Sequence, residues 1–285
     1  MINSYISIDL ETTGLNPKKE RIIEIGALRV VEGEVLETFH TLVNPYRPLP
    51  PQIQELTGIT DAMLQSCPDT AQVIPKLLDF CQELPLLGHK ILFDYAFIKR
   101  AAVNMGREWE RDGVDTLVLA RRFMPREEKK SLAAACAFYG VEGEGWHRAL
   151  ADACRTHRLY QKLKTLYGEA NKDAFMAKRL VYKSKKEQPA AKRQKERLQE
   201  LLKYHRIEAP VQMDDLTRNE ASRLTDRILS AYGRPGTGGN RMFVGGNKEI
   251  RWDSSILFGS NRETPEAEQN AGMKKEVKVN DESAR

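Results

Sequence analysis

The sequence lacks the features of secreted, disulfide-stabilised and membrane-spanning proteins. Its four cysteines form no CxxC pair, so neither disulfides nor zinc ligation is indicated. No uninterrupted apolar run approaches the roughly 18 residues that a membrane-spanning helix needs. The N-terminus also has no basic segment followed by an apolar one, the pattern of a secretory signal. We therefore expect free thiols in a reducing compartment and a cytoplasmic location.

Size and charge indicate one folded domain with a basic appendage. With 285 residues and 41% hydrophobic content, the chain can fill a core of ordinary size. Residues 1–168 hold 21 basic and 22 acidic residues, whereas residues 169–232 hold 15 and 10. Between Lys178 and Arg206 the counts are 11 basic and 3 acidic. Such a surplus attracts a polyanion such as nucleic acid, although a solvated helix face would have the same composition.

The spacing of apolar residues predicts strands first and helices afterwards. Alternation and β-branched runs predict three antiparallel strands near residues 5–11, 21–31 and 35–43, with a glycine turn at 32–34. Helical periodicity predicts helices near residues 71–83, 93–105, 116–123, 131–139 and 148–167, with short strands at 86–88 and 113–115. This order predicts an α/β fold with a mixed five-stranded sheet flanked by helices.

Beyond the expected domain at residues 1–168, three further segments are predicted. Residues 169–188 are expected to be a basic linker, 189–232 a helical hairpin, and 233–285, which are rich in glycine and then charged, a disordered tail. Pro189 suits the first turn of one helix, and Thr217 with Glu220 predicts a capping box on the other. Because two helices alone bury too little surface, we expect the hairpin to dock on the preceding domain or on a partner.

Acidic residues in the first 152 positions predict a metal site. Asp9 and Glu11 are two residues apart on the first strand, so they share one face with Cα atoms about 6.5 to 7 Å apart. Such side chains can converge on two cations about 3.5 to 4 Å apart, the spacing used for in-line displacement at phosphorus. Clustered carboxylates repel one another unless cations neutralise them, and oxygen ligands favour two Mg²⁺ or Mn²⁺ ions over zinc. The predicted set comprises Asp9, Glu11, Asp94, His147 and Asp152.

The five-residue spacing from His147 to Asp152 predicts where each of them lies. On one continuous helix the two side chains would point about 140° apart, so His147 should precede the helix and Asp152 should lie in its first turn. An imidazole pKa near working pH suits a general base that takes a proton from the attacking water. Gly143 and Gly145 would allow the preceding loop to move when substrate binds.

Each candidate also has an ordinary structural explanation. An Asp at a helix start, such as Asp94 or Asp152, commonly caps the helix or interacts with its dipole. A single histidine such as His147 is commonly an incidental surface residue, and we interpret His89 mainly as a structural residue of its loop. The functional interpretation therefore depends on these residues occurring together and in order.

The three runs resemble the motifs of the DEDDh exonucleases, the group that includes the proofreading epsilon subunit of bacterial replicative polymerases, RNase T and oligoribonuclease. Residues 9–15 (Asp-Leu-Glu-Thr-Thr-Gly-Leu) are similar to the first motif, residues 89–94 to the second and residues 147–152 to the third, with a further similar segment at 56–59. The resemblance covers about residues 3–166. It implies an RNase H-like fold and hydrolysis in the 3′-to-5′ direction.

The resemblance also implies roles for single residues. Asp9, Glu11 and Asp152 would hold the metal ions, Asp94 would assist them, and His147 would be the general base. Thr12, Thr13 and Leu15 would border the 3′-terminal nucleotide.

Two positions depart from the usual pattern of the family. Lys90 stands where members often have Asn, and it could contact a phosphate or point to solvent. Trp146 stands where a small residue or Pro often precedes the histidine, and it could stack on a base or pack under the loop. Neither departure removes a predicted catalytic residue.

The sequence therefore predicts a metal-dependent 3′-to-5′ exonuclease that releases nucleoside 5′-monophosphates from DNA in proofreading or repair. An RNase T-like enzyme that trims RNA 3′ ends is the alternative among enzymes. A non-catalytic nucleic-acid-binding or polymerase-tethering module is the alternative from another class. The predicted partner is a single-stranded or frayed 3′ end, and a DNA polymerase is a second candidate partner.

Overall fold

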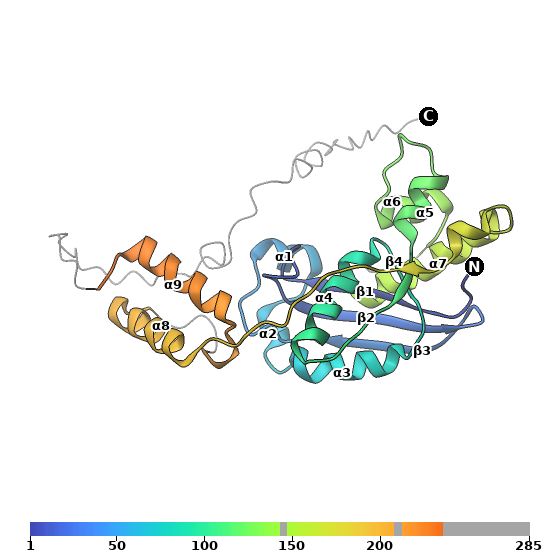
Figure 1. The fold of residues 1–285 in the computed structure, drawn as a ribbon. Coiled ribbons are helices and arrows are strands. Elements are labelled where there is room, and N and C mark those ends of the chain that lie inside the picture. The colour runs from blue at the N-terminus through green and yellow to red at the C-terminus, as the bar shows by residue number, and fades with distance from the viewer. Residues whose placement is uncertain (143–146, 208–212, 236–285) are drawn as a thin grey trace, which may run out of the picture.

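The described residues, 1–142, 147–207 and 213–235 of a computed structural model, form a helix-flanked sheet and a separate pair of helices (Figure 1). Among them the sheet has six strands in the order β3-β2-β1-β4-β5-β6. The strands are β1 (Tyr5–Thr12), β2 (Ile22–Val31), β3 (Glu34–Leu42), β4 (Leu86–Gly88), β5 (Asp112–Asp115) and β6 (Lys178–Arg179). Strands β1, β4 and β5 run parallel, while β2 and β6 are antiparallel to their neighbours β1 and β5, and β3 is antiparallel to β2. The mixed sheet is confirmed, but the predicted count of five strands is wrong, because the two-residue β6 lies in the stretch expected to be a linker.

The helices agree closely with the predicted periodicity. They are α1 (Pro51–Thr57), α2 (Asp61–Leu64), α3 (Thr70–Cys81), α4 (Ile91–Asn104), α5 (Thr116–Phe123), α6 (Leu132–Tyr139), α7 (Ala149–Tyr167), α8 (Lys192–His205) and α9 (Arg218–Tyr232), with 3₁₀ turns at Glu169–Phe175 and Met213–Asp215. The five helices predicted in the first 168 residues, α3 to α7, begin and end within two residues of the expected positions. Local capping sets several of these ends: Asp69 and Gln72 form a capping box on α3, and Ser131 caps α6. Helices α1 and α2 were not predicted, because they are too short to have a clear period.

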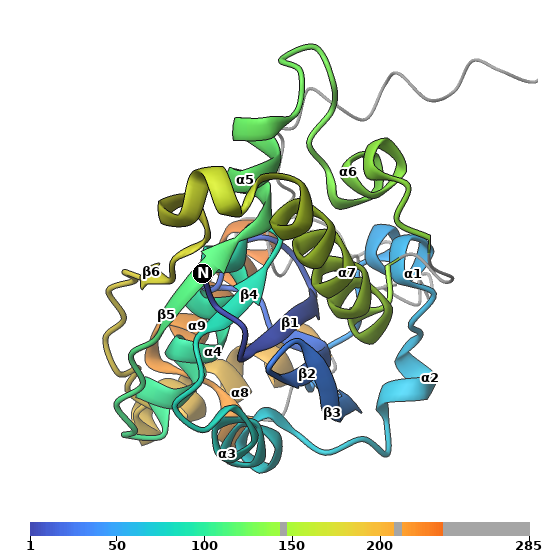
Figure 2. The same ribbon diagram turned by 90° about the vertical axis from the view of Figure 1, so that its right-hand side faces the viewer.

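The alternation along β1 sends its residues to two different layers. Ile6, Ile8 and Leu10 pack with α3 and α4 in one apolar cluster. Ser7 points to the opposite face and donates a hydrogen bond to the carbonyl of Ala153 in α7 at 2.8 Å. Figure 2 shows α7 and α3 on opposite faces of the sheet. By the same alternation, Asp9 and Glu11 belong to the face that α7 covers.

The helical hairpin docks on the sheet domain through a glutamate that also begins one of its helices. Glu220 accepts the backbone N–H of Thr217 at 3.1 Å, which confirms the capping box predicted for α9. Its carboxylate also forms ion pairs with Arg21 and with Arg47, the latter at 2.8 Å. Docking on the preceding domain is therefore confirmed. The expected role of Pro189 is wrong, because α8 begins only at Lys192 and Pro189 forms an extended bridge with Thr217.

The stretch expected to be a basic linker is fixed along the edge of the sheet domain. Phe175 is fully buried in the apolar cluster under α5, α6 and α7, and Leu180 packs in the cluster under α3 and α4. Further along, the Glu187 N–H donates to the side chain of Asn104 in α4 at 3.0 Å. The division of the chain into domains stays a prediction. Because Phe175 and Leu180 belong to the core of the sheet domain, a truncated protein has to keep the residues up to Leu180 in order to fold.

Two compositional expectations can be compared with the structure. All four cysteines are free, and Cys81 and Cys136 are buried. Within the described ranges, no helix combines the length and apolarity needed to cross a bilayer. The predicted tail lies outside the described residues from position 236 onward.

Candidate active site

The two acids of β1 lie opposite a glycine and a glutamate of β2. Asp9 pairs with Gly26 and Glu11 pairs with Glu24 in the antiparallel register. A Cβ atom at residue 26 would lie only 2.1 Å from the backbone nitrogen of Leu150, in the first turn of α7. Because glycine leaves that space to the helix, the start of α7 rests directly on the sheet beside Asp9.

The third acid, Asp94, comes from the first turn of α4. Asp94 is 3% exposed, and its carboxylate accepts the backbone N–H of Leu10 at 3.1 Å. Leu10 is the residue between Asp9 and Glu11, so this bond holds the start of α4 against the segment that carries both acids. The structure therefore brings Asp94 to the same end of β1, as the sequence predicted.

His147 and Asp152 occupy the positions that their spacing predicted. Helix α7 begins at Ala149, so His147 precedes it and Asp152 lies in its first turn. The His147 N–H donates to Asp152 Oδ2 at 3.2 Å, and Arg155 donates to Asp152 Oδ1 at 2.7 Å. These contacts fix the Asp152 carboxylate, while the His147 side chain is exposed.

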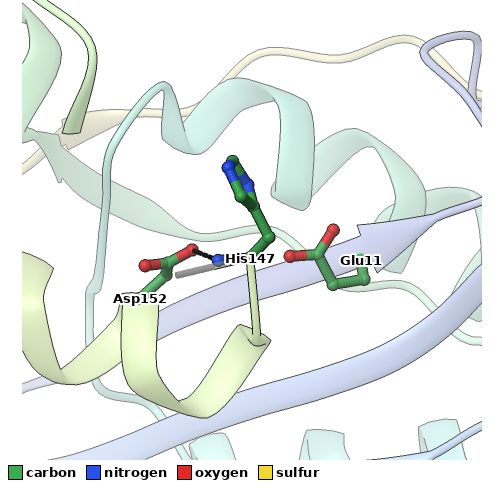
Figure 3. A group of neighbouring side chains, drawn as sticks. All are labelled: Glu11, His147 and Asp152. Carbon is green, nitrogen blue, oxygen red and sulfur yellow. Dashed lines mark hydrogen bonds between the residues drawn. The ribbon is translucent and has the colours of Figure 1, made fainter. Parts of the chain in front are cut away.

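Glu11, His147 and Asp152 surround one point in space. Each of them offers a ligand atom, and these atoms all lie within 4.8 Å of one another. Figure 3 shows the Glu11 carboxylate pointing from β1 toward the segment that carries His147 and Asp152. Two segments far apart in the sequence, β1 and the start of α7 with the residues before it, thus supply oxygen and nitrogen atoms to one small volume.

The electrostatics of the acids indicate a site that is incomplete without added positive charge. Burial raises the pKa of Asp9 well above its usual range, and the nearby carboxylates of Asp94, Glu11 and Asp152 raise it further. Burial and the charges of Asp152 and Glu24 raise the pKa of Glu11 to about 7. Burial also raises the pKa values of Asp94 and Asp152. Bound divalent cations would offset this repulsion, and the oxygen-rich donor set fits such ions.

A fifth acid, Glu24, was not predicted from the sequence and anchors the start of α7. It is fully buried, and it accepts hydrogen bonds from Arg148 Nη2 at 2.8 Å, from Arg148 Nε at 3.0 Å and from the Ala149 N–H at 3.0 Å. His40 lies 2.7 Å away on β3. Burial alone would raise the pKa of Glu24, but these donors hold it below its usual value. Since Arg148 follows His147 directly, Glu24 positions the segment that carries the histidine.

A Glu24→Gln substitution tests this positioning role. The amide keeps the shape but loses the charge and turns an N–H₂ group toward the Arg148 donors, so we expect a loss of about 2 kcal/mol in the free energy of unfolding. We also expect kcat to fall more than KM changes, because His147 is displaced. Urea unfolding and steady-state kinetics measure both. The matched control is Glu37→Gln, whose ion pair with Arg29 is half-exposed and should contribute at most about 1 kcal/mol; equal effects of the two substitutions would contradict the role of Glu24.

The residues expected to border a substrate lie at the end of β1, which closes at Thr12, and on the loop that follows it. Thr12 donates its hydroxyl to the Gly14 carbonyl at 2.8 Å, and Thr13 donates to Glu20 at 2.7 Å, so both hydroxyls shape the loop itself. Leu15 is 60% exposed and is free to contact a ligand. Their roles toward a substrate stay predictions.

Near the second motif, His89 has the structural surroundings that we expected. Its ring nitrogens lie 3.0 Å from the Thr116 hydroxyl and 2.8 Å from the Lys130 carbonyl. Lys90 is exposed, with its Nζ 5.9 Å from the centre of the Phe93 ring. The expectations for Gly143, Gly145 and Trp146 fall outside the described residues.

Comparison with known proteins agrees with this geometry. The family profile described as Exonuclease (RNase_T) matches residues 6–160, which is more than half of the chain. The chain therefore belongs to the DEDDh exonuclease family, as its motifs suggested.

Two curated relatives and one solved structure specify the similarity. The DNA polymerase III subunit epsilon of Aquifex aeolicus is 37% identical over 161 residues, which are 56% of this chain and 80% of that protein. The PolC-type DNA polymerase III of Clostridium perfringens is 36% identical over 166 residues, 57% of this chain but only 12% of that protein. Escherichia coli Exonuclease I in complex with a dT13 oligonucleotide has a TM-score of 0.53 at 19% identity, covering 60% of this chain and 43% of that one, and supports the fold alone.

Proposed function

We propose that this protein is a metal-dependent 3′-to-5′ exonuclease that acts on DNA and releases nucleoside 5′-monophosphates. The observation that carries the proposal is the convergence of Asp9, Glu11, Asp94 and Asp152 with His147 at one end of β1. The names of the most similar relatives, a polymerase III epsilon subunit and a PolC-type polymerase III, favour DNA over RNA and favour a proofreading role.

The acids fit a pair of Mg²⁺ or Mn²⁺ ions, with Asp9, Glu11 and Asp152 as direct ligands and Asp94 assisting. Such ions, when bound, would increase the acidity of a water molecule and stabilise negative charge on the phosphate oxygens. Asp94 and Asp152 are already fixed by the Leu10 N–H and by Arg155. The site therefore needs little rearrangement of its carboxylates to accept cations.

The imidazole of His147 is the group that accepts a proton from the attacking water. Its ring is exposed, and its backbone is held through the Asp152 carboxylate and, one residue later, through the pair of Arg148 with Glu24. A base held at the backbone and free at the ring can reach the water while staying near the acids. Leu15, exposed on the loop after β1, contacts the terminal nucleotide.

Matched 3′-labelled DNA and RNA oligonucleotides in Mg²⁺ test the substrate. We expect faster release of labelled 5′-monophosphate from DNA, and with label at the 5′ end we expect a ladder of progressively shortened products. A strong preference for RNA would replace the proposal by the RNase T-like alternative. Binding without any hydrolysis of either polymer would favour a tethering module instead.

The proposal also covers the protein partner, the cellular location and the kind of 3′ end that is used. Similarity to polymerase subunits favours association with a DNA polymerase, and a cytoplasmic location remains the expectation from the sequence. Single-stranded, paired and mismatched 3′ ends compared in one assay would define whether the enzyme prefers frayed termini.

A further inference from the structure

A basic cavity lies beside the docked hairpin. It has a volume of about 440 Å³ and is bordered by the extended stretch 182–188, by α4 and by the first residues of α9. A cavity of this size can hold a small ligand or part of a polymer. Six cationic side chains line it: Lys18, Arg100, Lys183, Lys185, Lys186 and Arg218.

The positive charge of this cavity is poorly compensated. Among the described residues that line it, the one carboxylate belongs to Glu187, which forms an ion pair with Arg100. Across the described ranges, the other five cationic side chains form no ion pair. Ser184 is also one of the lining residues, and its hydroxyl is buried without a hydrogen-bond partner among the described residues. Uncompensated cations beside an unused hydroxyl are suited to phosphate oxygens.

The cavity adjoins the loop that leaves the candidate active site. Lys18 lies seven residues after Glu11, so their Cα atoms are no more than about 25 Å apart. The Lys18 carbonyl accepts a hydrogen bond from Arg100 at 3.3 Å, and the far end of the loop, Arg21, pairs with Glu220 of α9. At 3.4 Å per phosphate, one strand would cross that distance in at most about seven nucleotide steps. Figure 1 places α8 and α9 beyond the helices α1 and α2, outside the sheet domain.

We propose that this cavity binds backbone phosphates of the substrate strand on the 5′ side of the bond to be cleaved. The inference rests on the proposed function for the identity of the polyanion, while the charge of the cavity is independent of it. Phosphates held here would place the 3′ end of the strand in the metal site and raise the affinity for long substrates without reading sequence.

The triple variant K183Q/K185Q/K186Q tests the proposal in a binding measurement. With EDTA present to prevent hydrolysis, fluorescence anisotropy gives the affinity for 5′-labelled dT20 over a series of salt concentrations. Loss of three contacts should reduce the slope of log affinity against log salt by about 2. The control K129Q/K162Q/K203Q removes three exposed lysines that do not line the cavity and should leave the slope unchanged.

A charge-conserving variant distinguishes an electrostatic effect of the three lysine substitutions from an effect on folding. K183R/K185R/K186R should retain most of the salt slope, whereas a structural role of the lysines would change both triple variants alike. Equal slopes for K183Q/K185Q/K186Q and the control would overturn the proposal.

Kinetics distinguish failure of this inference from failure of the proposed function. With Mg²⁺, the glutamine variant should raise KM for dT20 at least fivefold more than KM for dT3, which offers only two internucleotide phosphates. Absence of hydrolysis by the unmodified protein together with a reduced slope would refute the function but support the cavity. Hydrolysis with equal KM effects on dT3 and dT20 would support the function and refute the cavity.

Discussion

The Asp9→Asn variant should lose at least about 10³-fold in kcat, a loss that corresponds to several kcal/mol of transition-state stabilisation. The carboxylates of Asp94, Glu11 and Asp152 all raise the pKa of Asp9, so Asp9 lies among the other acids of the site. An amide keeps its shape but cannot supply the negative charge that holds a cation. Hydrolysis of 3′-labelled DNA measures the loss, and binding of dT20 should change little because the basic cavity is separate.

The Asp9→Asn substitution should increase the stability of the folded protein when metal is absent. Removing one of the mutually repelling carboxylates lowers the electrostatic repulsion within the folded protein, so the midpoint of urea unfolding in EDTA should rise. The stabilisation that Mg²⁺ adds should shrink, because binding to the folded state is weakened. Asp79→Asn, at an exposed position of α3, is the control and should alter neither quantity. Unchanged turnover of Asp9→Asn would refute the site assignment.

Gly26→Ala should disable the site without touching any of its polar groups. The added methyl group would lie 2.1 Å from Leu150 N and 2.3 Å from the carbonyl carbon of Ala149. These are backbone atoms, so no change of side-chain rotamer can remove the clash. Helix α7 must therefore move away from β2 and carry Asp152 with it. We expect a loss of about 3 kcal/mol in the free energy of unfolding and at least about 10²-fold in kcat.

Gly33→Ala provides the matched control on the hairpin between β2 and β3. Gly33 has φ of +91° but ample space, since the nearest atom to an added Cβ lies 3.7 Å away. Its substitution should cost about 1 kcal/mol of stability from backbone strain and leave kcat unaltered. A Gly26→Ala enzyme with normal kcat would mean that α7 is not held in place by this close contact.

Patterns that extend over neighbouring residues were predictable from the sequence. The alternation of Ile6, Ile8 and Leu10 assigned Asp9 and Glu11 to one face, and helical spacing located α3 to α7 within two residues. The angle between positions 147 and 152 on a helix placed His147 before α7. Each of these deductions uses only the local geometry of one element.

Features made by contacts between distant segments were not predictable in this way. Nothing near Glu24 in the sequence marks Arg148, 124 residues away, as its partner, although a lone acid in the apolar run Ile22 to Ile25 was a usable signal. The importance of Gly26 is likewise visible only with α7 in place. The basic composition of residues 169–188 suggested a free linker, and it did not indicate that Phe175 and Leu180 fill two apolar clusters.

Glu220 makes the folding of the hairpin and its attachment interdependent. One carboxylate completes the first turn of α9 and also forms ion pairs with both Arg21 and Arg47 on the sheet domain. If α9 frays at its start, the anchor is released, and Arg218 leaves the wall of the basic cavity. A substrate DNA strand bound in that cavity would in turn favour the state in which the first turn of α9 is helical and anchored to the sheet domain. Strand engagement and helix ordering would therefore reinforce each other through thermodynamic linkage.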